Sequence, residues 1–341
     1  MVTKMKNAVF MGVDTPINEV YSDTVKEKLF REFCFPTKDI MKSDKLDEYR
    51  DVLAKTDYIF STWGMPSLTE EQIRGYLPNL KAVFYGAGTV QKFARPFLAC
   101  GVKIFSAWAA NAVPVSEYTF AAVIMAAKGY FHRLHRQSGG SAWSHRDVPV
   151  AFPGNYDIKV GIIGAGMIGK LVIGKLKTAL ERIEVLVFDP FLPDEKAAEL
   201  GVKKVSLETL FAESDVISNH LADNAQTKGM LDYHLFSLMK KGSTFINTGR
   251  GAQVVEDDMI RALKEDGTYR MAVLDVTEPE PPMPSSPLYT LDNVFLTPHI
   301  AGSLGNEHHR MSEFMYEEAT AFDKGLPTRY EVTAKMLETM A

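Results

Sequence analysis

Short runs of apolar and β-branched residues alternate along the chain with stretches in which apolar positions recur at helical spacing. Each run predicts a strand, at residues 7–13, 58–62, 81–86, 102–106, 159–164, 183–189, 215–221, 243–248, 269–276 and 293–298. Most of them are apolar throughout rather than alternately apolar and polar, which is typical of strands that are buried on both faces. The pattern therefore predicts an α/β protein with open, doubly wound parallel sheets.

Two polar breaks divide this alternating pattern. Residues 135–155 are rich in Gly, Ser and Pro, and residues 299–310 form a second break. After the second break, apolar residues recur at helical spacing, so the chain is expected to end on an amphipathic helix that packs back onto the N-terminal domain. We therefore predict two Rossmann-like or flavodoxin-like domains. Residues 1–130 plus 305–341 form one, and residues 131–304 are inserted as the other.

The predicted strand at residues 159–164 runs into three closely spaced glycines. Gly164, Gly166 and Gly169 fit the spacing GxGxxG, and apolar positions at helical spacing follow them. Between a strand and a helix, the first glycine allows a tight turn and the second lets the backbone approach a diphosphate. The third lets the helix pack closely on the strand, and the N-terminus of the helix stabilises the phosphate charge. A dinucleotide-binding loop is thus favoured over a purely structural turn.

An acidic residue, Asp189, ends the next predicted strand, twenty residues after Gly169. A carboxylate at this point accepts hydrogen bonds from the adenosine ribose hydroxyls and repels a 2′-phosphate. Residues 190–193, Pro-Phe-Leu-Pro, contain no Arg or Lys that could compensate for the phosphate. The segment favours NAD(H) over NADP(H). The alternative is that Asp189 is a surface turn residue.

Three further polar residues come just after predicted strands. Arg250 lies between two glycines, Glu280 lies in a proline-rich loop, and His299 follows the last predicted strand. Taken singly, each is more often a surface or structural residue. Together, at the strand ends of a dinucleotide-binding sheet, they supply a cation for a carboxylate, a proton donor and a partner for that donor.

Four motifs follow one another in the second half of the chain: GIIGAGMIG, INTGRGAQVVEDDMIRAL, LDVTEPEP and LTPHIAG. In order and approximate spacing they resemble the NAD-dependent D-2-hydroxyacid dehydrogenase family, which includes D-lactate, D-3-phosphoglycerate and glyoxylate/hydroxypyruvate enzymes. The resemblance covers essentially all of the inserted domain. It extends weakly into the first domain through FYGAGTV and ANAVPVSEYTFAAVIMAAKG. It is specific for the family but not for a substrate.

The resemblance implies a role for each polar residue. Arg250 binds the substrate carboxylate and polarises the carbonyl group, a task that suits a planar guanidinium. His299 is the general acid in reduction and the base in oxidation, and Glu280 hydrogen-bonds the other imidazole nitrogen. Asp275 holds the position that contacts the nicotinamide carboxamide. The other implied cofactor contacts, beside the three glycines and Asp189, are Met167, Ile168, Leu221, Thr227, Thr248, Gly249 and Ala301.

The substrate side departs from the family pattern. Ala87 and Gly88 match the loop whose backbone N–H groups receive the substrate carboxylate, but the residues that follow lack the acid found in many members. Trp108 lies where a small or proline-containing stretch is commoner, and Trp63 follows another predicted strand. Either these two indoles line an apolar substrate pocket or they pack in the domain core. Both interpretations stay open.

The resemblance implies an NAD-dependent oxidoreductase that interconverts a D-2-hydroxy acid and its 2-oxo acid as a homodimer. The alternative is an NAD(H)-responsive binding protein, because some corepressors share this fold and can retain the Arg, Glu and His set. A formate dehydrogenase is disfavoured, since that enzyme would carry Gln in place of Glu280. The sequence does not predict which 2-hydroxy acid is used, nor the physiological direction.

Composition narrows the possible partners. The 341 residues carry a formal net charge of −5, so neither nucleic acid nor a membrane is an expected partner. The longest apolar run, residues 118–127, is too short to cross a bilayer, and the first apolar run is too short for a secretory signal. The two cysteines fit no metal-site spacing. We expect a cytoplasmic protein without a bound metal.

Overall fold

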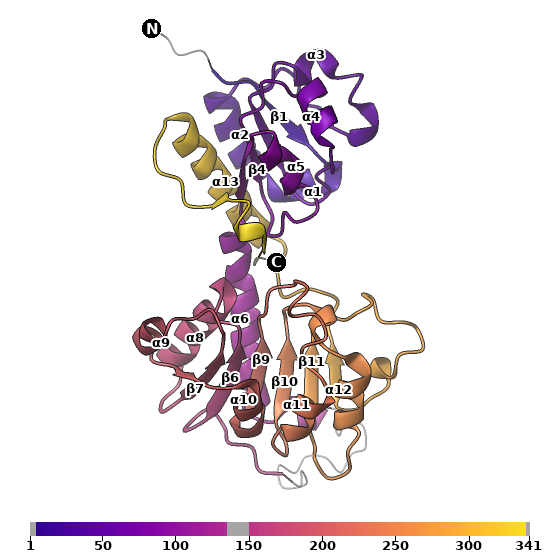
Figure 1. Cartoon of the computed structure of the whole chain (residues 1–341), viewed down its shortest axis with the longest axis vertical. Coiled ribbons are helices and arrows are strands. Elements are labelled where there is room, and N and C mark those ends of the chain that lie inside the picture. Colours follow the sequence, from indigo (N-terminus) through magenta and orange to yellow (C-terminus); the bar gives the residue numbers. More distant parts are fainter. Residues whose placement is uncertain (1–4, 135–149, 339–341) are drawn as a thin grey trace. The chain divides into compact units, whose positions relative to one another are not determined.

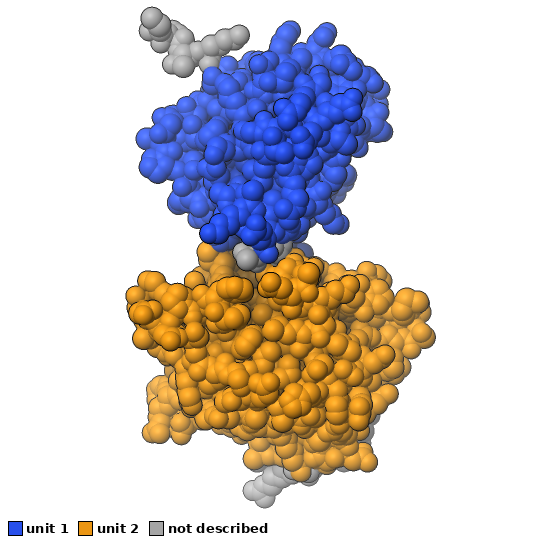
Figure 2. Space-filling view, viewed as in Figure 1, with its two compact units in different colours: residues 1–111, 303–341 blue, residues 112–302 orange. Residues whose placement is uncertain are grey.

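The computed structural model describes residues 5–134 and 150–338, and the chain divides into two compact units (Figures 1 and 2). One unit comprises residues 1–111 and 303–341, and the other comprises residues 112–302. The sequence predicted the first boundary after residue 130, beyond the end of a long apolar helix. That helix, α6 (Trp108–Ala127), instead starts in the first unit and buries Val123 and Ala126 in the core of the second. The inserted unit therefore begins inside α6, earlier than expected.

The first unit is built on one sheet with the strand order β13-β5-β4-β3-β1-β2. Its strands are β1 (Ala8–Met11), β2 (Ile40–Met41), β3 (Tyr58–Ser61), β4 (Ala82–Tyr85), β5 (Lys103–Ser106) and β13 (Glu331–Val332). β13 pairs antiparallel with β5, and the other pairs are parallel. Its helices, besides the start of α6, are α1 (Asp14–Val20), α2 (Asp23–Glu32), η1 (Ser43–Lys45), α3 (Arg50–Leu53), α4 (Glu70–Tyr76), α5 (Ala94–Ala99), α13 (Glu307–Asp323) and η5 (Met336–Glu338).

Helices cover both faces of this sheet, because successive strand residues point to opposite sides. One face carries an aromatic layer in which the ring of Phe84 stacks on Phe60 and Phe105, at centroid distances of 5.3 Å and 5.0 Å. Helices α1, α2 and α13 cover that layer, and α3, α4 and α5 cover the other face. The C-terminal helix thus packs onto the N-terminal part of the chain, as its amphipathic pattern predicts.

The second unit has one fully parallel sheet, with the order β12-β11-β10-β9-β6-β7-β8 (Figure 1). Its strands are β6 (Lys159–Ile163), β7 (Glu184–Phe188), β8 (Lys203–Lys204), β9 (Val216–Asn219), β10 (Thr244–Asn247), β11 (Met271–Leu274) and β12 (Val294–Leu296). Its helices, besides most of α6, are α7 (Tyr130–Leu134), α8 (Met167–Ala179), α9 (Asp194–Leu200), α10 (Leu207–Glu213), α11 (Tyr233–Leu238), η3 (Gly251–Gln253), α12 (Glu256–Leu263) and η4 (Pro287–Tyr289).

This second sheet is also buried on both faces. Helices α6, α8 and α9 pack on one face, against β-branched residues such as Val160 and Val187. Helices α10, α11 and α12 pack on the other face, where Phe245 contacts Phe236 edge-to-face at a centroid distance of 5.1 Å. Because all strands run the same way, their carboxyl ends lie along one edge of the sheet. The loops at that edge carry the candidate residues.

The α/β class and all ten strands expected from the apolar runs are confirmed. The strands that the pattern missed, β2, β8 and β13, have two residues each and therefore carry no readable periodicity. They lie at the edges of the two sheets, where the pairing strand supplies most of the order. In the described part of the chain, no helix is both long and apolar enough to span a membrane.

Candidate functional site

The three glycines of the GxGxxG segment have different structural roles. Gly164 has a φ of 89°, and a Cβ there would lie 2.8 Å from the carbonyl oxygen of His220. A Cβ on Gly169 would lie 2.1 Å from the carbonyl oxygen of Gly164. A Cβ on Gly166 would meet no described atom within 4 Å. The fold itself therefore requires Gly164 and Gly169, whereas the absent side chain of Gly166 only keeps open the space in front of helix α8.

That space faces the N-terminus of α8, a helix of 13 residues. Gly166 is its N-cap residue, so no side chain caps the first N–H groups, and no acidic residue occupies the first turn. Met167 in that turn is exposed, while Ile168 packs against the core. Uncapped N–H groups and the positive end of the helix dipole favour an anion. The loop thus fits the diphosphate of a dinucleotide.

The carboxylate of Asp189, at the end of β7, contacts the glycine-rich loop. Its Oδ2 accepts a hydrogen bond from the N–H of Ala165 at 2.8 Å, and its Oδ1 accepts one from Phe191 at 2.8 Å. The side chain is only partly buried, and a carboxylate offers about four acceptor positions. Asp189 therefore lies beside the loop with acceptor capacity left for a ligand hydroxyl.

Arg250 follows β10 in an extended conformation between two glycines. A Cβ on Gly251 would lie 2.0 Å from the carbonyl carbon of Thr277, so only glycine allows this close approach of two backbones. The guanidinium is half-buried and its Nη1 donates to the carbonyl oxygen of Gly249 at 2.7 Å. Among the ion pairs of the described residues, which include His299 with Glu280 and Arg270 with Glu265, none involves Arg250. The remaining N–H donors of Arg250 are thus suited to an external anion.

His299 and Glu280 form a direct contact. The Nδ1 atom of His299 lies 2.6 Å from Oε1 of Glu280, and the two side chains are 48% and 42% exposed. With Nδ1–H donating to the carboxylate, the Nε2 atom stays available for another partner. A short bond of this kind to a charged acceptor also fixes the plane of the ring.

Asp275 holds the turn that presents His299. Its Oδ1 accepts hydrogen bonds from the Thr297 hydroxyl at 2.7 Å and from the N–H of Ile300 at 2.8 Å. Its Oδ2 accepts one from the N–H of Ala301 at 2.9 Å. His299 itself has a φ of 55°, which is uncommon for a residue with a side chain and is stabilised here by these bonds. The expected contact between Asp275 and a nicotinamide stays a prediction.

The other residues expected to contact the cofactor lie along the same edge of the sheet. Leu221 and Thr227 belong to the loop after β9, and Thr248 and Gly249 directly follow β10. Thr248 is buried, and its hydroxyl lies 3.1 Å from that of Thr119 on α6. Since β6, β9, β10, β11 and β12 are neighbours, the structure brings all candidate residues of this unit to one edge. Their contacts with a cofactor stay predictions.

In the first unit, Ala87 and Gly88 lie in the loop after β4. The hydroxyl oxygen of Ser106 lies 2.9 Å and 2.5 Å from their carbonyl oxygens, and the Thr62 hydroxyl donates to the carbonyl oxygen of Gly86 at 2.8 Å. Within the described residues, no acceptor is hydrogen-bonded to the N–H of Ala87 or of Gly88. A loop with its carbonyl groups held by hydroxyls and its N–H groups unused is suited to an anion.

The two indoles of the first unit have different environments. Trp108 packs against the core and contacts Tyr330 edge-to-face at a centroid distance of 5.8 Å. Trp63, after β3, is 37% exposed, and its indole contacts the ring of His308 edge-to-face at a centroid distance of 5.4 Å. Trp108 therefore packs against the core of the first unit, and a contact between its indole and a substrate stays untested. Trp63 stays a candidate for contact with a substrate.

Several polar residues at these strand ends were not expected from the sequence. They are Thr62 and Ser106, which hold the loop after β4, and Asn219, Asn247 and Gln253, which lie under the Arg250 segment. Most of them share one feature: each is a polar residue at the last position of an otherwise apolar strand or immediately after it. That position could have singled them out.

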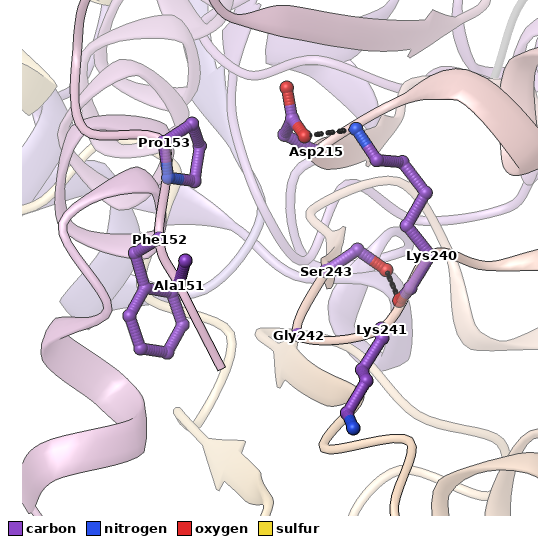
Figure 3. Close-up of a pocket in the computed structure, with 8 residues that line it drawn as sticks. All are labelled: Ala151, Phe152, Pro153, Asp215, Lys240, Lys241, Gly242 and Ser243. Carbon is purple, nitrogen blue, oxygen red and sulfur yellow. Dashed lines mark hydrogen bonds and ion pairs between the residues drawn. The ribbon is translucent and has the colours of Figure 1, made fainter. Parts of the chain in front are cut away.

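A cavity of about 270 Å³ opens elsewhere in the second unit, lined by Ala151, Phe152, Pro153, Asp215, Lys240, Lys241, Gly242 and Ser243 (Figure 3). Asp215 and Ser243 directly precede β9 and β10, so the cavity lies at the amino edge of the sheet. An ion pair joins Asp215 to Lys240 there. No candidate site residue lines this cavity, and no cluster of His, Cys and acidic residues in the described ranges could hold a metal ion.

The amino-acid sequence of the chain was compared with those of known proteins and protein families. Residues 120–301 match the family model described as D-isomer specific 2-hydroxyacid dehydrogenase, NAD binding domain. The chain is 34% identical over 239 residues to a D-3-phosphoglycerate dehydrogenase of Archaeoglobus fulgidus, covering 70% of this chain and 44% of that one. It is 35% identical over 213 residues to a glyoxylate reductase of Korarchaeum cryptofilum, covering 62% and 63%. The matches thus span less than two thirds of either relative.

The fold is similar to that of solved structures along the whole chain. A phosphoglycerate oxidoreductase from Rhizobium etli superposes with a TM-score of 0.79 at 22% identity, covering 98% of this chain and 100% of that one. At this level of identity the similarity concerns the fold. The α/β fold of this chain is therefore also found in a protein of known structure.

Proposed function

Because the chain belongs to the D-isomer specific 2-hydroxyacid dehydrogenase family, we propose that it is an NAD(H)-dependent oxidoreductase that interconverts a D-2-hydroxy acid and its 2-oxo acid. The observation that carries the proposal is the 2.6 Å contact between His299 and Glu280 at the carboxyl edge of the sheet that also bears Arg250. The reduction of a 2-oxo acid requires a proton donor with a charged partner, and a guanidinium that no carboxylate of the described residues neutralises.

The cofactor would be held by the glycine-rich loop and the strand ends beside it. Gly164, Gly166 and the N-terminus of α8 would bind the diphosphate, and Asp189 would accept hydrogen bonds from the ribose hydroxyls. The negative charge of Asp189, with no Arg or Lys in residues 190–193, favours NAD(H) over NADP(H). A reduced nicotinamide supplies a hydride when it is bound.

The substrate would be bound through its carboxylate. The guanidinium of Arg250 can form two parallel hydrogen bonds with a carboxylate and draw electron density from the neighbouring 2-oxo group. The unused N–H groups of Ala87 and Gly88 support the prediction that they also bind a carboxylate, and the exposed indole of Trp63 supports a contact with the substrate side chain. Variants at Gly88 and Trp63 would test these two predictions separately from Arg250.

His299 would transfer the proton. In the direction of reduction, its Nε2–H donates a proton to the carbonyl oxygen as C2 gains the hydride, so that the 2-oxo acid becomes a 2-hydroxy acid. Glu280, on Nδ1, stabilises the positive charge of the imidazolium and keeps Nε2 facing the substrate. In oxidation, the neutral imidazole accepts the hydroxyl proton. The reduction is thus complete with one proton from His299 and one hydride from the reduced nicotinamide.

Two further proposals come from the family resemblance rather than from contacts. The protein would be a homodimer, which light scattering tests directly: a mass equal to one chain contradicts it. It would act in the cytoplasm on a small 2-oxo or 2-hydroxy acid. Fractionation of cells that produce the untagged chain tests the location.

The function is tested by following NADH oxidation at 340 nm with a panel of 2-oxo acids. The panel contains glyoxylate, hydroxypyruvate, pyruvate, phenylpyruvate, a branched-chain 2-oxo acid and phosphohydroxypyruvate. We expect turnover with at least one of them, and its loss in the His299→Ala variant with NADH binding retained. Tight NADH binding without turnover on any member would contradict the enzyme and favour the NAD(H)-responsive binding protein.

A further inference from the structure

Three buried amide side chains lie under the Arg250 segment, and we call them the amide cluster. Asn219 and Asn247 are the last residues of β9 and β10 and face each other in the parallel register, and Gln253 ends η3. All three are at most 1% exposed. The Nδ2 of Asn219 donates to Oδ1 of Asn247 at 3.0 Å and to Oε1 of Gln253 at 2.6 Å. Since Nδ2 carries two hydrogens, one side chain joins the other two.

The amide cluster holds the backbone of Arg250 on both sides. The N–H of Arg250 donates to Oε1 of Gln253 at 3.3 Å, and its carbonyl oxygen accepts from Nδ2 of Asn247 at 3.1 Å. The N–H of Gly249 donates to Oδ1 of Asn247 at 3.1 Å. The strand ladder ends at Asn247, so these side chains replace the backbone pairing that a longer strand would have provided.

The same cluster also holds the loop after β9. The N–H of Leu221 donates to Oδ1 of Asn219 at 3.2 Å, and its carbonyl oxygen accepts from Nε2 of Gln253 at 2.8 Å. Gln253 thus bonds to Leu221 with its nitrogen and to Arg250 with its oxygen. The cluster connects two loops that belong to different strands, and Gln253 is the residue that bridges them.

The amide cluster is not needed merely to fill the core between the two loops. Burying an amide costs free energy unless its hydrogen bonds are made, and an apolar side chain of the same size fills a core without that cost. The fit is also tight, because a Cβ on Gly249 would lie 2.9 Å from Oε1 of Gln253 and 3.0 Å from Nδ2 of Asn219. What three paired amides provide, and apolar groups cannot, is a fixed direction for each backbone group that they bind.

We propose that the amide cluster positions Arg250 for the substrate carboxylate, with Gln253 as the residue that sets the Arg250 segment against the loop of Leu221. The proposal rests on the proposed function. Arg250 is tied to this segment through the bond from Nη1 to Gly249, so a shift of the backbone moves the guanidinium with it. A bidentate contact with a carboxylate loses most of its strength when the planar fork is misdirected.

The first test measures the backbone itself and needs no activity. Amide hydrogen exchange is followed by mass spectrometry in the full chain and in its Gln253→Met variant, which keeps the side-chain length but makes none of these bonds. We expect exchange at least tenfold faster in the peptides that contain Leu221 and Arg250, and unchanged exchange in the glycine-rich loop at 164–166. Unchanged exchange in both peptides would overturn the proposal.

The second test asks whether Gln253 acts through Arg250. We expect Gln253→Met to lower kcat/KM for the best 2-oxo acid at least tenfold, mostly through KM. In the Arg250→Lys background the same change should cost less than about threefold, because an ammonium on a flexible stem does not depend on the direction of a fork. Equal losses in the two backgrounds would indicate a merely structural role and overturn the proposal. Glu71→Met, at an exposed position on helix α4 and outside the proposed site, is the control and should leave kcat/KM unchanged.

These tests distinguish a failure of the proposed function from a failure of the positioning role of the amide cluster. If the parent protein reduces no 2-oxo acid, the proposed function fails, and hydrogen exchange still decides whether the cluster holds the two loops. If Gln253→Met does not fold, Gln253→Glu keeps the acceptor for the N–H of Arg250 but, when ionised, cannot donate to Leu221. Exchange should then rise in the Leu221 peptide alone, and equal protection of both peptides would contradict the bridging role of Gln253.

Discussion

The Nδ1 atom of His299 and the Oε1 atom of Glu280 lie 2.6 Å apart, although the residues belong to the loops after two different strands. The contact depends on the left-handed backbone of His299, whose turn Asp275 holds through the N–H groups of Ile300 and Ala301. The pair is therefore assembled by the parallel packing of β11 and β12. Because the two side chains contact each other directly, replacing either one tests the role of the pair.

Replacing Glu280 by Gln removes the negative charge but keeps a side chain of the same size. The bond from His299 then goes to a neutral acceptor, and a hydrogen bond to a charged group contributes about 1.5–3 kcal/mol. We expect kcat to fall about 10- to 100-fold with little change in KM. Steady-state kinetics of Glu280→Gln beside the parent measures this. Unaltered kcat would show that Glu280 has no part in proton transfer.

Replacing Gly166 by Ala separates cofactor binding from folding. A Cβ at Gly166 meets no described atom within 4 Å, so the variant should fold normally, yet the methyl group would occupy the space where a diphosphate approaches. We expect the Kd for NADH to rise at least tenfold while Tm changes little. Gly174→Ala, also without described neighbours and on the same helix, is the control, and its Kd should equal that of the parent.

Gly169→Ala, unlike Gly166→Ala, should destabilise the fold. Its Cβ would lie 2.1 Å from the carbonyl oxygen of Gly164, so the helix must move away from the strand. Overpacking of this kind costs about 1–3 kcal/mol of the free energy of unfolding. Thermal denaturation followed by circular dichroism should give a lower Tm than for Gly166→Ala. Equal Tm values for the two variants would contradict the different roles given to these glycines.

Asp189 is expected to set the choice of dinucleotide. Asp189→Asn keeps an acceptor for the N–H of Ala165 but removes the charge that repels a 2′-phosphate. The ratio of kcat/KM for NADH to that for NADPH should fall at least tenfold. Kinetics with both dinucleotides under the same conditions gives this ratio. An unchanged ratio would show that Asp189 does not set the preference for NADH over NADPH.

Burial lowers the pKa of His220 from its ordinary value of 6.5 to about 3. Between these values the unfolded chain binds a proton that the folded chain does not bind. The free energy of unfolding therefore decreases as the pH falls below 6.5, by about 1.4 kcal/mol per pH unit. Urea denaturation at pH 7 and pH 5 should show a loss about 2 kcal/mol larger in the parent than in His220→Gln. Equal losses would contradict a buried neutral imidazole.

The fold could be predicted from sequence wherever burial leaves a continuous pattern. The central strands are apolar runs, and the GxGxxG segment, Arg250, Glu280 and His299 come within a few residues after such runs. The boundary inside α6 was not predicted, because Trp108–Ala127 runs as one helix through the boundary and Pro114, just after it, does not end the helix. Two-residue edge strands also carry no pattern.

The supporting residues of the site were harder to predict for a different physical reason. The bond between Asn219 and Asn247 depends on the register of β9 and β10, which no local pattern encodes. The role of Asp275 in holding the His299 turn likewise depends on how two loops meet. Sequence shows which residues carry the chemistry, whereas the structure shows which residues fix their positions.

The central claim, hydride transfer to C2 of a 2-oxo acid, is tested most directly by following an isotope. NADH that carries deuterium at the transferred C4 position is incubated with the protein and the best 2-oxo acid of the panel other than glyoxylate, whose product has no D and L forms, and the product is analysed by chiral chromatography and mass spectrometry. We predict a D-2-hydroxy acid with one deuterium at C2, and no product with His299→Ala. Product without deuterium, or the L-isomer, would contradict the proposed reaction.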